Sequence, residues 1–187
     1  NKRLEDLDPA WAWETYSPSA EQPWTRFDVA HVYRRVGFAG NHEQLAKGES
    51  LAPLELVDQL LRASEPDDYQ TEVKDVAQAM LATGKTNNLS AWWLYRMLGT
   101  PCQALEKATL FWHGHFATSG DKVTDPRMMI DQNRILREFA LSDFGQMVHR
   151  ISMDPAMLIY LDSVTNRKAH PNENFARELM ELFCLMR

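Results

Sequence analysis

The feature that most constrains the fold of this chain is the spacing of its apolar residues, which follows the period of an α-helix. The clearest stripe, at i, i+3, i+4, i+7 and i+8, consists of Val73, Val76, Ala77, Met80 and Leu81. Gly84 ends that stripe, and Leu89 to Leu98 indicates a further short, aromatic helix. No segment shows the sustained period-two alternation of a half-buried strand. The sequence therefore predicts an all-α fold with no significant sheet.

Start signals divide this pattern into separate helices. Thr25 followed by Asp28 is typical of a helix N-terminus, and Gly37 follows the apolar positions of that helix. The other predicted starts are a Thr100-Pro101 cap with Gln103, the caps Asp125, Ser142 and Asp154, and Pro171 at the opening of the last helix. We expect an irregular multi-helix bundle of about eight or nine helices.

The segment before Thr25 lacks a helical pattern. It is rich in proline and tryptophan, with Pro9, Trp11, Trp13, Pro18, Pro23 and Trp24. We expect an extended arm over residues 1–24 whose aromatic side chains pack on a helical domain over residues 25–187. Binding through exposed tryptophans is the alternative.

The charge balance and the apolar runs bear on the partners. Twenty basic and 26 acidic side chains give the 187 residues a net charge of −6. Nucleic acid is therefore not expected as the main partner, because phosphate neutralisation needs clustered Lys and Arg. No apolar run approaches the roughly 20 residues that span a bilayer. The chain begins at Asn1 without a signal-peptide pattern, and we interpret it as a fragment of a longer protein.

The first candidate site is His113-Gly114-His115. On a continuous helix the two imidazoles point to different sides, so they share a metal ion only if Gly114 breaks the helix. If the helix continues, Glu106, Leu110 and His113 lie on one face. The alternative function for both histidines is structural hydrogen bonding.

The second candidate site is the last helix. Glu173, Arg177 and Glu181 lie at i, i+4 and i+8, so they share one side of the helix. This spacing is typical of ion pairs on a solvent-exposed helix face. Glu178 lies at the margin of an apolar stripe, where a carboxylate needs a partner such as Arg, His or a metal ion. A structural salt bridge and a catalytic role both remain open for Glu178.

The loop before that helix is rich in donors and acceptors. Arg167 and neighbouring backbone N–H groups suggest an anion site near a helix start. The favoured alternative is a loop held by hydrogen bonds of Asp162 and Asn166, with Asn172 pointing inward to anchor it.

Two long motifs resemble a large bacterial family known as domain of unknown function 1800. They span residues 106–119 and 171–183, further similar segments cover residues 31–38, 92–98 and 154–162, and the likeness runs from about Trp24 to Phe183. The resemblance implies an exported or periplasmic protein, longer than this chain and without an assigned activity. Genes of the family often lie beside those of a secreted, sulfatase-like family, so the resemblance also implies an envelope role and a protein partner. This chain closes where the family continues with further helices.

Two functions remain open at this point. The favoured one is a non-catalytic helical module that binds a protein partner or the C-terminal half of its own protein. The alternative is a hydrolase that uses His113 or His115 with Glu178, as an acid–base pair or as ligands of a divalent metal ion.

Overall fold

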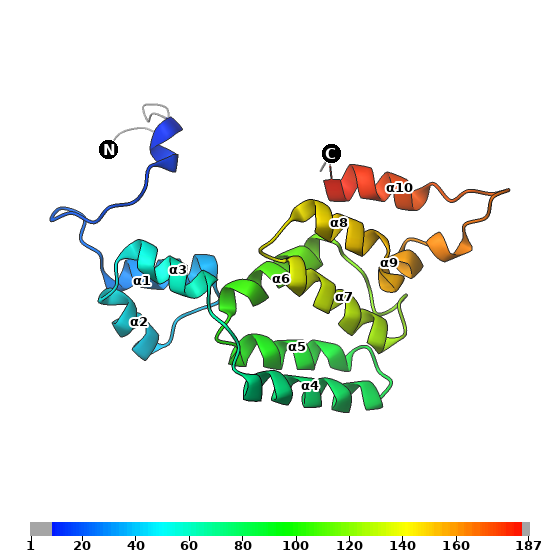
Figure 1. Ribbon diagram of the computed structural model, residues 1–187, viewed down its shortest axis with the longest axis horizontal. Coiled ribbons are helices and arrows are strands. Elements are labelled where there is room, and N and C mark those ends of the chain that lie inside the picture. Colours follow the sequence, from blue (N-terminus) through cyan, green and yellow to red (C-terminus); the bar gives the residue numbers. More distant parts are fainter. Residues whose placement is uncertain (1–8, 185–187) are drawn as a thin grey trace. The chain divides into compact units, whose positions relative to one another are not determined.

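The computed structural model describes residues 9–184 and is built from α-helices, as predicted (Figure 1). The chain divides into two compact units, Asn1–Gln59 and Leu60–Arg187. The helices are α1 Arg26–Val36, α2 His42–Glu49, α3 Pro53–Leu61, α4 Asp67–Ala82, α5 Asn88–Gly99, α6 Gln103–His115, α7 Pro126–Phe139, α8 Phe144–Ser152, α9 Pro155–Tyr160 and α10 Asn174–Glu178. Short 3-10 helices cover Pro9–Trp13 and Ser163–Thr165, and a π-helix covers Leu179–Cys184. Within the described residues no strand occurs, and a single bridge joins Arg167 to His170.

The first unit is built on the close approach of α1 and α2. Val29 is fully buried, and a Cβ added at Gly48 would lie 2.4 Å from Val29 Cγ1, so only glycine fits there. Trp24 Nε1 donates to the Gly48 carbonyl at 3.0 Å, which attaches the preceding segment to α2. The predicted packing of the aromatic arm is confirmed for Trp24 and is wrong for Trp13, whose side chain is 89% exposed. The side chain of Trp11 lies outside the described residues.

The second unit contains two apolar clusters that meet at α7. One joins α4, α5 and α7 through Val73, Ala77, Leu89, Trp92 and Ile130. The other joins the end of α6 with α7, α8, α9 and the chain's last turn through Phe116, Leu136, Met147, Ile151, Met157, Leu161 and Phe183. Because both clusters include residues of α7, this helix packs against both.

Several predicted helix starts are confirmed. Asp28 Oδ2 accepts from Thr25 N at 2.9 Å, Asp125 Oδ1 accepts from Arg127 N at 2.9 Å, and Asp154 Oδ2 accepts from Met157 N at 3.0 Å. Each carboxylate satisfies a backbone N–H at or beside the helix start, where these groups lack helical partners. Gly84, predicted to end α4, has φ +67°, a conformation that glycine adopts without steric cost.

Three other starts were predicted at the wrong residue. Asp143, not Ser142, caps α8, with its Oδ1 accepting from Gln146 N at 2.7 Å. Helix α6 begins at Gln103, because the Thr100 hydroxyl is engaged by Cys102 N and by Glu65. The last helix begins at Asn174 and not at Pro171, since Asn172 bonds back to the preceding loop and precludes an earlier turn.

Candidate functional site

The most completely satisfied polar group in the second unit is the carboxylate of Glu106 on α6. Its side chain has no exposed surface. Arg96 Nε on α5 donates to Oε1 at 2.7 Å, and Trp93 Nε1 on the same helix donates to Oε2 at 3.1 Å. Arg137 on α7 donates through Nε to Oε1, and through Nη2 to Oε2 at 3.0 Å. One buried carboxylate therefore joins three helices.

The arginines determine the protonation of this carboxylate. Burial by itself raises the pKa of Glu106, because a charged group is poorly solvated in the interior. The hydrogen bonds and positive charges of Arg137 and Arg96 outweigh burial and hold the pKa of Glu106 below its ordinary value. Glu106 is thus a carboxylate at neutral pH and serves as a fixed acceptor.

A second carboxylate completes the cluster. Arg96 Nη2 donates to Glu65 Oε1 at 2.7 Å and to Oε2 at 2.6 Å, and the Thr100 hydroxyl donates to Oε1 at 3.0 Å. Arg137 Nη2 also donates to Asn133 Oδ1 at 2.7 Å. We call Glu65, Arg96, Glu106 and Arg137 the Glu106 network. Its two carboxylates and two guanidinium groups cancel in charge, and this pairing makes their burial tolerable.

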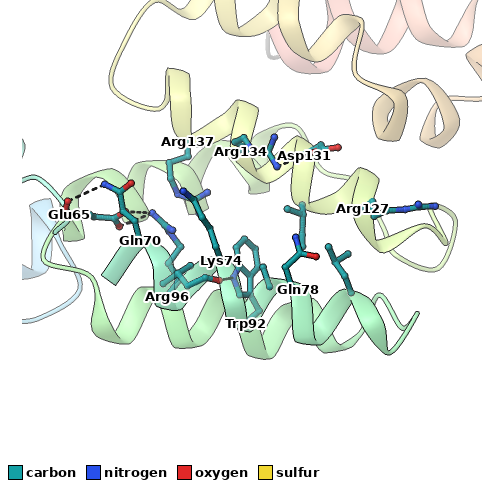
Figure 2. Close-up of a pocket in the computed structure, with 14 residues that line it drawn as sticks. Glu65, Gln70, Lys74, Gln78, Trp92, Arg96, Arg127, Asp131, Arg134 and Arg137 are labelled. Carbon is teal, nitrogen blue, oxygen red and sulfur yellow. Dashed lines mark hydrogen bonds and ion pairs between the residues drawn. The ribbon is translucent and has the colours of Figure 1, made fainter. Parts of the chain in front are cut away.

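A pocket of about 660 Å³ opens beside this network, between α4, α5 and α7 (Figure 2). Its apolar side is formed by Val73, Ala77, Leu81, Trp92 and Ile130. Its polar side is formed by Glu65, Gln70, Lys74, Gln78, Arg96, Arg127, Asp131, Arg134 and Arg137. We call this space the charged pocket. Five of its side chains carry positive charge and two carry negative charge, in a chain whose net charge is −6.

The cations around the charged pocket differ in how firmly they are paired. Arg134 pairs with Asp131 at 2.9 Å and Arg127 with Asp125 at 2.9 Å, and both arginines are largely exposed. Exposed pairs contribute little to stability and exchange easily with another anion. Lys74 has no ion-pair partner within residues 9–184, and Figure 2 shows its side chain extending from α4 in the direction of α7. Lys74 therefore gives the pocket an uncompensated positive charge.

The histidines lie on opposite sides of an unbroken helix. Helix α6 continues through Gly114 to His115. The His113 ring meets the edge of the Trp93 ring, with centroids 4.9 Å apart, and lines a pocket of about 260 Å³ beside Asn133. His115 Nε2 lies 2.8 Å from the Phe183 carbonyl. The condition for a shared metal ion, a helix break at Gly114, is therefore not met.

His115, Asp162 and Glu178 do come together around one cavity. This His115 cavity has a volume of about 680 Å³ and is also lined by Lys122 and Asn174. Lys122 Nζ donates to Asp162 Oδ2 at 2.8 Å and to the Tyr160 carbonyl at 2.7 Å. Glu178 pairs with its neighbour Arg177 at 3.2 Å. The structure thus gives Glu178 an ion-pair partner of the kind predicted, although the guanidinium is half exposed.

The remaining candidate binding residues hold the loop itself. Asn172 Nδ2 donates to the Asp162 carbonyl at 3.0 Å, and Asn166 Oδ1 accepts from Asn172 N at 3.0 Å. Asn172 therefore points inward, as predicted. Arg167 forms the backbone bridge to His170. Arg177 also donates to Asn174 Oδ1 at 2.8 Å, and within the described residues it forms no ion pair with Glu173 or Glu181, contrary to the prediction. Each of these residues has a structural role in the loop or the last helix.

No three His, Cys, Asp or Glu side chains lie together as a metal site in the part of the chain that the structure describes. The set of His113, His115 and Glu178, considered as shared ligands, is not assembled, because His113 lines a different pocket from the other two. No described helix has the length and apolarity needed to cross a membrane.

Sequence analysis missed the charged pocket. Its basic residues are scattered from Lys74 to Arg137, so they form no cluster in the sequence. One signal was present: Arg127, Arg134 and Arg137 lie at i, i+7 and i+10, which places them on one face of α7. The predicted shared face of Glu106 and His113 is confirmed, since Trp93 contacts both side chains.

Comparison with known proteins gives one match. The family described as "Protein of unknown function (DUF1800)" matches residues 31–186, which is most of the chain. No curated protein and no solved structure matches the chain significantly.

Proposed function

Because the chain belongs to the DUF1800 family, whose description assigns no activity, we propose a function from its best-formed site: the chain is a binding module that holds a small anionic ligand with an apolar part in the charged pocket. The observation that carries this proposal is that five cationic and five apolar side chains line one pocket in a chain whose net charge is −6.

The charge of the pocket favours an anion. Within the Glu106 network two arginines balance two carboxylates, so Lys74 is left over. Arg134 lies about one helical turn before Arg137 on α7. Among the described residues its ion-pair partner is the exposed Asp131. An entering carboxylate, sulfate or phosphate group would replace water around Lys74 and would compete with Asp131 for Arg134.

The floor of the pocket favours an apolar part on the same ligand. Val73, Ala77 and Ile130 are buried core residues that also line the pocket. The indole N–H of Trp92 donates to the Val73 carbonyl at 3.1 Å, so this ring offers the pocket carbon surface. The volume of about 660 Å³ lies within the range of roughly 300–1,000 Å³ for small-molecule sites. An alkyl or aromatic group joined to one anionic group matches both sides of the pocket.

Calorimetric titration with decyl phosphate and decanoate tests this proposal. We expect both probes to bind, and decanol, which has the chain without the charge, to bind at least tenfold more weakly. Lys74→Gln should weaken decyl phosphate binding about tenfold, the loss expected for one charge-assisted hydrogen bond. Arg150→Gln on the exposed side of α8 removes the same charge elsewhere and should leave binding unchanged. Equal affinity for decanol and decyl phosphate would refute the proposal.

The protein partner and the export that the family resemblance implies are further proposals. The exposed apolar side chains in the second unit that support a partner include Leu98, at 80%, and Phe111, at 62%. Fractionation of cells that express the native gene tests export, and recovery in the periplasmic or secreted fraction is the expected result. Neither the family match nor the geometry supports the hydrolase alternative.

A further inference from the structure

The pocket beside His113 differs from the charged pocket in its chemistry. Its volume is about 260 Å³, several times the roughly 30 Å³ that one water molecule occupies. It is lined by two indoles, one imidazole and a set of hydroxyl and amide side chains, with no Lys, Arg, Asp or Glu. An ion entering this pocket would lose its hydration without a countercharge, so the lining favours a neutral ligand.

Two residues that line this pocket, Asn133 and His113, carry hydrogen-bond donors. Asn133 is 4% exposed, and its Oδ1 is fixed by the bond from Arg137, so its Nδ2 lies on the other side of the amide. Nδ2 has no acceptor within residues 9–184. This amide nitrogen is therefore held, without a protein partner, in a residue that lines the pocket.

His113 supplies the second donor. Its Nδ1 is buried and has no hydrogen-bond partner in the described part of the chain. A bare lone pair is tolerated in such a position better than an unpaired N–H, which assigns the ring proton to Nε2. Burial also lowers the pKa of His113, so the ring is neutral at neutral pH. The neutral ring then acts as a donor to an oxygen in the pocket.

The indoles supply carbon surface and no donors. Trp93 Nε1 is bonded to Glu106 and Trp92 Nε1 to the Val73 carbonyl. The electron-rich faces and edges of such rings pack against C–H groups of a ligand. At the rim, Ser90 and Asn87 are exposed and have no hydrogen-bond partner among the described residues, so they can both donate and accept.

We infer that the His113 pocket is a binding site for a small neutral polyhydroxy molecule of monosaccharide size. Such a ligand places an acceptor oxygen against Asn133 and His113, its ring C–H groups against the indoles, and further hydroxyl groups at Ser90 and Asn87. The site is separate from the charged pocket, and it does not depend on an anion binding there.

The test is an NMR titration of the wild-type protein with N-acetylglucosamine and glucose as neutral probes. Glucosamine and glucuronate serve as charged analogues of similar size. We expect the neutral sugars to shift the Asn133 side-chain amide and the His113 ring signals, and the charged analogues to bind at least tenfold more weakly. Absence of any shift with the neutral sugars, or equal binding of glucuronate, overturns the inference.

Variants test whether the sugar binds in the His113 pocket. His113→Phe keeps an aromatic ring beside Trp93 and removes the donor, so sugar affinity should fall about tenfold. His149→Phe, at an exposed position of α8, is the matched control and should bind as the wild type does. If His113→Phe does not fold, the Asn87→Ala and Ser90→Ala double variant at the rim replaces it, with the same expected loss. Lys74→Gln should leave sugar binding unchanged, and unchanged affinity in the His113→Phe or rim variant overturns the site.

Discussion

The charged pocket and the His115 cavity have similar volumes, about 660 and 680 Å³, but their charged groups are held in different ways. Beside the first, Glu106 is fully buried and accepts hydrogen bonds from three side chains on two other helices, and it thereby fixes Arg96 and Arg137 of the pocket lining. In the second, Lys122 and Asp162 form an exposed pair, and Glu178 is paired with its neighbour in sequence. Buried, fully bonded charges fix a geometry, whereas exposed pairs rearrange at little cost.

The two sites also differ in how far apart their residues lie in the sequence. His115, Asp162 and Glu178 of the His115 cavity were candidate site residues because they occur in segments of the sequence rich in polar side chains. The charged pocket brings together Glu65, Lys74 and Arg137, which are far apart in the chain. Polar density in the sequence pointed to these residues, but the better preorganised site is assembled by helix packing.

The largest expected effect is that of Glu106→Ala. This change leaves Arg96 and Arg137 buried beside each other without their shared carboxylate. The free energy of unfolding should fall by about 3–5 kcal/mol, as when one partner of a buried ion pair is removed. Glu178→Ala, the matched change in the His115 cavity, should cost less than about 1 kcal/mol. Urea denaturation of both variants measures the difference, and equal losses would remove the contrast between the two sites.

Low pH should remove the contribution of Glu106 to the stability of the folded protein. The pKa of Glu106 is lowered in the folded protein, so its contribution to stability is complete above the ordinary carboxyl pKa of about 4.3. That contribution is lost as the pH falls through the folded-state pKa of Glu106. Wild-type stability should therefore drop over this range more steeply than that of Glu106→Gln. If the melting temperature falls with pH in parallel for the two proteins, Glu106 is not the cause of the loss of stability at low pH.

His115→Ala should have an intermediate effect. The hydrogen bond between His115 Nε2 and the Phe183 carbonyl joins α6 to the last turn of the chain. Its loss should lower the free energy of unfolding by about 1 kcal/mol, together with some loss of aromatic packing. Hydrogen exchange should show faster opening of residues 174–184 and unchanged protection of α4. Uniform loss of protection would instead place His115 in the global core.

The smallest effect is expected for Asp131→Asn. Its pair with Arg134 is exposed, so stability should change by no more than about 0.5 kcal/mol. Removing the competing carboxylate should nevertheless strengthen decyl phosphate binding in the charged pocket. Calorimetry that finds weaker binding in this variant would mean that Asp131 does not compete for Arg134.

Local signals predicted much of the fold and less of the sites. The stripe from Val73 to Leu81 identified α4, because apolar periodicity directly reflects burial of one helix face. Ser142 was chosen over Asp143 because adjacent capping residues are not distinguished by spacing alone. Glu106 and His113 were placed on one face, but the partners Arg96 and Arg137 come from other helices. Their convergence depends on tertiary packing, which no local pattern specifies.

The central claim is that the charged pocket, and not the His115 cavity, holds an anionic ligand. NMR titration with decyl phosphate, following side-chain signals at both places, tests it most directly. The account predicts saturable shifts for the Lys74 ammonium and the Arg134 guanidinium, with the His115 ring and Lys122 unaffected. Shifts confined to His115 and Lys122, with Lys74 and Arg134 unchanged, would contradict it.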